Sequence, residues 1–196
     1  MYKRQTLFSL MLDLIKPTTG DVLNDNINVR KSEDWKTFTS AFLDESFLIS
    51  YLMPEEYFYF VGELRNFNKD KVDEFLKQFE DLFNGEILGG KKFIRDLSKG
   101  NQKKVGIIAA LIGDPKVVIL DEPFANLDPT TQIRLKKIIK TLSQKVGVTV
   151  LVSSHDLKDV TEVSDRIVLL EKGLIIKDIK KTQKTLKDLE TYFNKE

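Results

Sequence analysis

The spacing of apolar and polar positions changes several times along the chain and divides it into helices and strands. Apolar residues at helical spacing predict helices at residues 6–15, 55–64, 70–83, 99–112, 129–144, 156–164 and 186–193. Two other stretches, VVIL at 117–120 and TVLVSS at 149–154, are continuously apolar and β-branched before they end in polar residues. Such runs are typical of strands buried on both faces of a parallel sheet.

Shorter segments complete this pattern. Residues 21–29 and 36–42 predict further strands, and residues 166–179 predict a hairpin that turns at Lys172-Gly173. Ser98 and Asp128 stand where helices should begin, and their side chains can cap the first free backbone N–H groups. Strands that alternate with helices predict an α/β fold with a parallel sheet and a helical insertion.

Composition narrows the class of protein. The 196 residues are 41% hydrophobic and 31% charged, which is ordinary for a folded globular protein. A net charge of +1 offers no general attraction for nucleic acid or an anionic membrane surface. The absence of cysteine excludes disulfides and thiolate metal sites and suits a reducing compartment. No apolar run is long enough to cross a bilayer, and no signal peptide is recognisable, so we expect a cytosolic type of chain.

Two adjacent carboxylates, Asp121 and Glu122, follow the apolar run VVIL. Ligands of open parallel sheets bind beyond the carboxyl ends of the strands. Paired carboxylates at that edge are costly to maintain without a cation or a chemical task. In phosphoryl transfer, one carboxylate holds Mg²⁺ and a neighbouring group positions or deprotonates the attacking water. The alternative interpretation is an ordinary acidic turn.

Two further segments are candidates for the same chemistry. In LSKGNQKK, Ser98, Gly100 and the free N–H groups of a helix start form an anion site. The alternative there is a capped helix with a basic first turn. His155, the only histidine, follows the second apolar run, and beside the acidic pair it could reach a γ-phosphate. The alternative is a structural histidine.

Together these segments resemble motifs of the ATPase subunits of ABC transporters. LSKGN is similar to the signature motif usually written LSGGQ, and VVILDE resembles the Walker B strand. ANLD at 125–128 resembles the D-loop, and His155 the switch histidine. The order and spacing agree, and the resemblance covers the chain from Thr6 onward.

The resemblance implies a P-loop NTPase core with a parallel sheet, flanking antiparallel strands and a helical insertion. Residues 1–44 would form a truncated N-terminal part of the ATP-binding core, and 45–113 the helical subdomain that contains the signature. Residues 114–196 would supply the rest of the core with its hairpin and last helix. Within this core, Asp121 would hold Mg²⁺ through water, Glu122 would be the general base and His155 would contact the γ-phosphate of ATP.

The resemblance also implies partners. Two ATPase subunits would form a head-to-tail dimer in which Ser98, Gly100 and Asn101 cap the ATP of the opposite subunit, while Asp128 couples the two sites. A transmembrane permease would be the second partner, and exposed aromatics of the run YFYF at 57–60 could contribute to docking it. The alternative, burial in the core of the helical insertion, is expected for at least two of these four rings. No nucleic acid is expected. The subunit would lie in the cytoplasm against the inner face of the cell membrane.

Departures from the family concern the signature and the Q-loop. Lys99 and Asn101 stand where Gly and Gln are commoner, and both leave the helix start intact. An ungapped alignment places Asp44 at the usual Q-loop glutamine, where a carboxylate could still accept from water or face Mg²⁺. A plain acidic loop is the alternative.

The first residues do not fit the family. Its phosphate loop, GK[ST]T, leads into the helix TLFSLMLDLI, which aligns Thr6 with the last threonine of the motif. Lys3, Arg4 and Gln5 then provide no nest of backbone N–H groups for phosphate. The bases GTG TAT AAG AGA CAG, with GTG read as initiator methionine, would encode MYKRQ, and these bases match the end of a transposon adapter used in sequencing libraries. We therefore expect that residues 1–5 are not native and that the truncated chain does not bind ATP normally.

Three functions remain open at this point. The first is an ATPase subunit that drives transport, and the Q-loop region together with the lack of an importer-style regulatory domain favours export. The second is a degenerate ABC-like module that binds partners without hydrolysis, although an intact acidic pair and His155 argue against decay. The third is a soluble ABC ATPase that acts on ribosomes or DNA, for which tandem cassettes or coiled-coil insertions would be expected.

Overall fold

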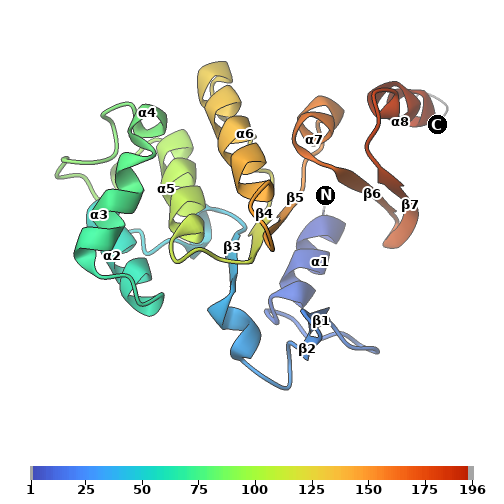
Figure 1. Ribbon diagram of the computed structural model, residues 1–196, viewed down its shortest axis with the longest axis horizontal. Coiled ribbons are helices and arrows are strands. Elements are labelled where there is room, and N and C mark those ends of the chain that lie inside the picture. The colour runs from blue at the N-terminus through green and yellow to red at the C-terminus, as the bar shows by residue number, and fades with distance from the viewer. Residues whose placement is uncertain (1, 194–196) are drawn as a thin grey trace.

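The computed structural model describes residues 2–193, with side chains from residue 5 onward (Figure 1). Its α-helices are α1 Tyr2–Met11, α2 Pro54–Leu64, α3 Lys69–Lys77, α4 Glu80–Phe83, α5 Lys99–Leu111, α6 Pro129–Ser143, α7 Leu157–Val163 and α8 Thr185–Phe193. Its strands are β1 Leu23–Asn24, β2 Ile27–Asn28, β3 Thr39–Phe42, β4 Val117–Leu120, β5 Thr149–Val152, β6 Arg166–Glu171 and β7 Leu174–Lys180. Short 3-10 helices are η1 Asp34–Thr37, η2 Glu45–Phe47 and η3 Ile94–Asp96.

A parallel sheet occupies the middle of the molecule, and its strands lie in the order β3-β4-β5 (Figure 1). Phe42 pairs with Leu120, and Leu120 with Val152, so the carboxyl ends of all three strands are level. The helices α2–α5 lie at one end of the molecule, and the β6–β7 hairpin with α8 at the other. The predicted α/β fold with a parallel sheet, flanking antiparallel strands and a helical insertion is confirmed.

The two predicted buried strands differ in the structure. In β4, Val118, Ile119 and Leu120 are fully buried. In β5, Thr149 is exposed and the other three residues are only partly buried, so the prediction that both strands are buried is wrong for β5. Edge position alone is not the reason, because β3 is the other edge of this sheet within residues 2–193 and is mostly buried. Strand β3 differs in its close contact with α5, where Gly106 meets the Phe42 ring.

Antiparallel pairs flank the sheet. The hairpin of β6 and β7 turns at Lys172 and Gly173, whose φ angles are 46° and 86°, as the sequence predicted. The small pair β1 and β2 turns at Asp25 and Asn26, whose φ angles are 48° and 63°. Positive φ at both turn residues matches the right-handed twist of paired strands. Among the described residues, none of the helices combines the length and apolar character that crossing a bilayer would demand.

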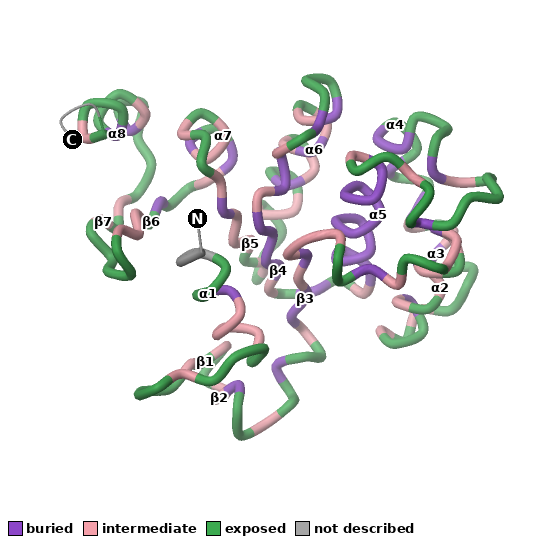
Figure 2. Tube along the Cα trace, turned by 180° about the vertical axis from the view of Figure 1, so that it is seen from behind, coloured by how far each residue is buried: buried purple, intermediate pink, exposed green. Residues whose placement is uncertain are grey.

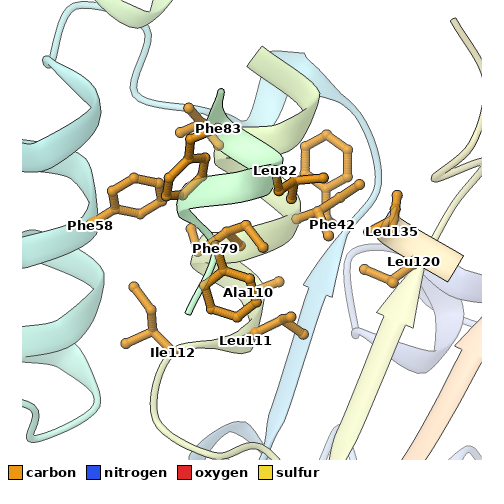
Figure 3. Close-up of a cluster of buried hydrophobic side chains, with 14 of the residues drawn as sticks. Phe42, Phe58, Phe79, Leu82, Phe83, Ala110, Leu111, Ile112, Leu120 and Leu135 are labelled. Atoms are coloured by element: carbon orange, nitrogen blue, oxygen red, sulfur yellow. The ribbon is translucent and has the colours of Figure 1, made fainter. Parts of the chain in front are cut away.

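The predicted helix at 70–83 is wrong in one respect, because the structure divides it into α3 and α4. The break lies at Phe79, whose φ of −117° is outside the helical range. Beyond the break, Leu82 and Phe83 are each only 2% exposed and face the core (Figure 3). The Phe79 ring packs against the rings of Phe75 and Phe83, with distances between ring centroids of 5.0 Å and 6.5 Å. The change of direction thus buries apolar side chains that follow it.

Helix α5 is the centre of the core. Every residue from Asn101 to Leu111 is buried, which gives one continuous buried stretch in Figure 2. The sequence predicted only one apolar face for this helix, because Lys103 and Lys104 interrupt the pattern. Gly106 allows the close approach of α5 to β3, since a Cβ there would lie 2.1 Å from the Phe42 ring. Helix α5 therefore joins the helical end of the molecule to the sheet.

The N-terminal elements differ from their predicted bounds. Helix α1 begins at Tyr2 and ends at Met11, whereas a helix at residues 6–15 was expected. Asp13 has a φ of 53°, which is outside the range of a right-handed helix, so the helix cannot continue through it. The strand predicted at 36–42 covers only β3, because η1 turns the preceding residues to bury Trp35. The Trp35 indole N–H donates to the carbonyl of Val29 at 3.0 Å. The structure does not describe the side chains of residues 1–4, which include Arg4.

Candidate functional site

The acidic pair and the histidine meet beyond the carboxyl ends of β4 and β5. These strands are parallel neighbours, so the residues that follow them emerge at the same edge of the sheet. The Nδ1 atom of His155 lies 2.9 Å from Oε2 of Glu122. The His155 side chain is 74% exposed and that of Glu122 30% exposed. The pair therefore faces solvent, where a ligand can reach it.

Asp121 differs from Glu122 in its surroundings. It is only 5% exposed, and its backbone N–H donates to the carbonyl of Phe42 at 3.0 Å. Its carboxylate accepts a hydrogen bond from the Ser153 hydroxyl, and Ser153 Oγ in turn accepts from the Glu122 N–H at 3.0 Å. Asp121 is thus fixed in orientation, and Ser153 connects the two strand ends.

Sequence reasoning missed Ser153. The only signal for it was its position, the first polar residue after β5, in line with Asp121 after β4. The Ser153 N–H donates to the carbonyl of Leu120 at 3.0 Å, which continues the ladder between the strands by one residue. Because Ser153 lies beside Asp121 in this ladder, its hydroxyl reaches the Asp121 carboxylate.

The turn after β4 has an unusual backbone. Glu122 has a φ of 46° and Asn126 a φ of 62°, in the left-handed region that L-residues other than Asn, Asp and Gly rarely adopt. The Ala125 N–H closes the turn on the Glu122 carbonyl at 3.2 Å. The Nζ of Lys103, from helix α5, also donates to that carbonyl, at 3.0 Å. Strained backbone of this kind persists only where surrounding contacts support it, and it clusters at functional sites.

The predicted anion site lies at the start of α5. Ser98 is exposed and caps the helix, its hydroxyl accepting from the Asn101 N–H at 3.2 Å. The Asn101 side chain is buried within the chain and donates to Glu86 Oε2 at 2.9 Å. A Cβ at Gly100 would meet Leu127 at 3.5 Å and Asn126 at 3.6 Å, which is ordinary contact. The fold itself therefore does not require glycine at position 100.

The remaining candidates occupy local structural positions. Asp128 caps α6 by accepting from the Thr131 N–H at 3.0 Å, and its hydrogen bonds with Thr131 lower the Asp128 pKa below its ordinary value. Asp44 caps η2 by accepting from the Ser46 N–H at 2.7 Å. Thr6 is an exposed residue in the middle of α1, not at its first turn. The structure thus brings together Asp121, Glu122 and His155, and it places the start of α5 against the segment that leads to Asp128.

The acidic pair can contribute to a metal site but does not complete one. Within residues 2–193, no three Asp, Glu or His side chains converge as a ready metal cage. Mg²⁺ is commonly bound by one or two carboxylates, with water and substrate phosphates as its other ligands. A single fixed carboxylate such as Asp121 matches that donor set. The residues present are therefore compatible with Mg²⁺ that arrives together with a nucleotide.

Comparisons of the sequence point to one family. The profile of the ABC transporter family matches residues 4–125, more than half of the chain. An uncharacterized ABC transporter ATP-binding protein of Alkalihalophilus pseudofirmus is 31% identical over 171 residues, which are 87% of this chain and 62% of that protein. The energy-coupling factor transporter ATP-binding protein EcfA2 of Staphylococcus epidermidis is 30% identical over 186 residues, which are 88% of this chain and 63% of that protein.

The fold is similar to that of a solved ATP-binding cassette. That structure is a dimer in a post-hydrolysis state, bound to ADP and phosphate. The TM-score is 0.75 at 22% identity, and the similarity covers 90% of this chain and 80% of the other. The chain spans less than two thirds of the length of the curated relatives that it matches.

Proposed function

We propose a function from one premise: this chain belongs to the ABC transporter family, among its ATP-binding subunits. The complete subunit would bind ATP with Mg²⁺ and hydrolyse it to drive transport through a membrane partner, whereas the chain without a phosphate loop is still expected not to bind ATP normally. The single observation that supports this most is the contact of Glu122 with His155 beside Asp121, at the common end of β4 and β5. This contact supports the assignment of Glu122 as proton acceptor and of His155 as its hydrogen-bonding partner, with the fixed carboxylate of Asp121 next to them.

The two carboxylates suit different tasks because their surroundings differ. Asp121 is buried and oriented by Ser153, which makes it the residue to hold Mg²⁺ through a water molecule. Mg²⁺ bound with ATP neutralises the charge that develops on the phosphate oxygens. Glu122 is partly exposed and can accept the proton of a water whose oxygen attacks the γ-phosphorus. As this O–P bond forms, the bond between the γ-phosphorus and the bridging oxygen of ADP would break, so that ADP and phosphate are the products and the proton resides on the Glu122 carboxylate.

His155 completes this arrangement. Its Nδ1 contacts the Glu122 carboxylate and thereby restricts where that carboxylate points. Because most of the imidazole is exposed, the rest of the ring can meet a γ-phosphate oxygen. His155 therefore aligns the base with the phosphate, a contribution of geometry rather than of proton transfer.

The start of α5 supports a second half of the proposal, a head-to-tail dimer. Ser98 is exposed, and the packing of the chain does not itself require glycine at position 100, so the N-terminus of α5 can approach a ligand held by another subunit. The dimeric cassette bound to ADP and phosphate, which shares this fold, is consistent with such an assembly. Ser98, Gly100 and Asn101 would close over the ATP of the opposite subunit, and Asp128 would couple the two sites.

A transmembrane permease is the proposed partner. Exposed aromatic side chains lie on and before α2, where Phe47 is 56%, Tyr51 66% and Phe60 42% exposed. Exposed aromatic residues are typical anchors of protein interfaces. The subunit would then reside in the cytoplasm on the inner face of the membrane. Export remains our proposal for the direction. Uptake is the competing outcome, because a relative that is 23% identical over 89% of this chain is named a methionine import ATP-binding protein. Reconstitution with the permease in vesicles decides between them.

Glu122→Gln in the complete subunit tests the proposed chemistry. The amide cannot take the proton, so ATP turnover should fall by about 100-fold or more, and the ATP-bound dimer should accumulate in gel filtration. Glu162→Gln is the matched control, because Glu162 is an exposed residue of α7 that pairs with Lys136. Turnover that is unchanged in Glu122→Gln would remove Glu122 from the mechanism. No hydrolysis in the unsubstituted subunit would favour a non-hydrolysing interaction module.

A further inference from the structure

Helix α5 buries two consecutive lysines. Lys103 and Lys104 are each only 6% exposed. A buried ammonium group is costly unless it is hydrogen-bonded, so its partners show what the position is used for. The Nζ of Lys104 donates to the Leu82 carbonyl at 3.3 Å, toward the helical end of the molecule. Lys103 points to the opposite side, toward the acidic pair.

Lys103 holds both ends of the turn that begins at Glu122. Its Nζ donates to the Glu122 carbonyl at 3.0 Å and to the Ala125 carbonyl at 2.9 Å. Within the turn itself, the Ala125 N–H donates to the Glu122 carbonyl at 3.2 Å. Because Glu122 is in the left-handed region, this backbone depends on contacts from outside the turn.

The charges around Lys103 are consistent with this position. Burial lowers its pKa, while Glu45, Glu122 and Asp121 act in the opposite direction and favour the ammonium form. Lys103 thus lies between η2, which contains Glu45, and the end of β4. One side chain of α5 thereby connects the segment that resembles the signature to the candidate general base.

We infer that Lys103 is a positioning residue, which fixes the turn at 122–125 so that the Glu122 carboxylate meets His155 and the chain continues correctly to Asp128. A displacement of α5 would then move the backbone of Glu122 directly. The inference rests on the proposed function only for its consequence in catalysis, because the positioning of the turn is a property of the chain without nucleotide.

Three variants separate this role from ordinary core packing. Lys103→Met keeps the length of the side chain and removes the donors, and Lys103→Arg keeps donors. Lys104→Met is the matched control, since Lys104 has the same burial on the same helix and a different acceptor. A purely structural lysine predicts the same behaviour for both methionine variants.

Hydrogen exchange of the nucleotide-free protein, measured by mass spectrometry, tests the positioning. In Lys103→Met, amides of residues 124–127 should exchange about tenfold or more faster, while β4 amides are unaffected. Lys104→Met should leave residues 124–127 unchanged, and Lys103→Arg should restore most of the protection. Equal patterns in the two methionine variants, or no change in Lys103→Met, would overturn the inference. If Lys103→Met does not fold, Lys103→Gln and Lys104→Gln replace the pair.

Steady-state kinetics of the complete subunit tests the catalytic consequence. Lys103→Met should lower kcat by about tenfold or more with the KM for ATP nearly unchanged, because the base is displaced while nucleotide binding is not. Lys103→Arg should recover most of kcat. Normal kcat in Lys103→Met would overturn the link to catalysis. Faster exchange at 124–127 without hydrolysis by any variant, the unsubstituted subunit included, would instead overturn the proposed function and leave the positioning intact.

Discussion

The end of the parallel sheet and the start of α5 are both candidate phosphate-contacting regions, but they are built differently. At the sheet, Asp121, Glu122 and His155 each meet a partner from another strand end within the chain. At α5, Ser98 is an exposed cap, and a Cβ at Gly100 would make only ordinary contacts with Leu127 and Asn126. Contacts within the chain therefore fix the side chains at the end of the sheet. The start of α5, in contrast, is an exposed surface whose ligand would be held by another subunit.

The two regions also differ in their backbone conformation. The sheet end contains the left-handed Glu122, whose backbone is supported by Lys103 and Ser153. The start of α5 has a regular helix cap without positive φ. Substitutions at the sheet end should therefore alter both stability and chemistry, whereas substitutions at the start of α5 should alter binding to the opposite subunit, with changes in stability limited to the helix cap and its neighbours.

The largest effect is expected from Glu122→Gly. Glycine accepts a positive φ without strain, so the free energy of unfolding should rise by about 1 kcal/mol. Hydrolysis should nevertheless fall by about 100-fold or more, because the proton acceptor is absent. Glu122→Ala is the control that loses the carboxylate but keeps the backbone penalty. Chemical denaturation and ATP turnover measure the two quantities, and a destabilised Glu122→Gly would show that the backbone is not strained.

A pair of glycine substitutions on α5 separates the two regions. Gly106→Ala should destabilise the fold by about 1–3 kcal/mol, because its Cβ would overlap the Phe42 ring. Gly100→Ala should leave stability unchanged or raise it by up to about 1 kcal/mol, as alanine is the better helix former. The same methyl group should weaken ATP-dependent dimerisation by about tenfold, because it would hold the opposite subunit's nucleotide away from the helix start. Dimerisation of Gly100→Ala at the normal concentration would argue against a ligand above this position.

Ser153→Ala tests how the strand ends are connected. Its loss leaves the buried Asp121 carboxylate and the Glu122 N–H without their common partner, which should cost about 1–3 kcal/mol of unfolding free energy. Ser154→Ala is the control, since within the part of the chain that the structure describes the Ser154 hydroxyl accepts only the local hydrogen bond from the Asp156 N–H. Urea denaturation compares the two, and similar losses in both variants would contradict the bridging role of Ser153.

The smallest effect concerns Glu86, beside the start of α5. Its hydrogen bond with Asn101, then the charge of Lys104, lowers the Glu86 pKa below its ordinary value. A lowered pKa in the folded state gives stability that is present above the ordinary pKa of 4.5 and is lost as the pH falls through the folded value. Stability measured between neutral and acidic pH should therefore decline more steeply in the unsubstituted protein than in Glu86→Gln. Parallel curves would show that this contact does not persist in solution.

Local signals explain how much of this arrangement could be predicted from the sequence. Some features depend only on neighbours in the chain, namely hairpin turns, helix caps and the polar residues that follow β-branched runs. The sequence therefore predicted the β6–β7 hairpin, the caps at Ser98 and Asp128, and the location of the acidic pair at the end of β4. The family resemblance added the roles of Asp121, Glu122 and His155, and these remain predictions. The bounds of helices and strands were less accurate, because the packing of Phe79 breaks one predicted helix and the burial of Trp35 shortens one predicted strand.

The order of elements and the parallel sheet were thus determined by the sequence, since apolar spacing and turn chemistry act over a few residues. Only the tertiary structure decided that β5 lies at an edge, that Ser153 joins Asp121 to Glu122 and that Lys103 reaches the same turn. The physical reason is distance along the chain. Lys103 is 22 residues from Ala125, and Ser153 is 32 residues from Asp121. The hydrogen-bond partner of such a lysine or serine cannot be predicted from neighbouring residues, because only the packing of the core brings the two residues together.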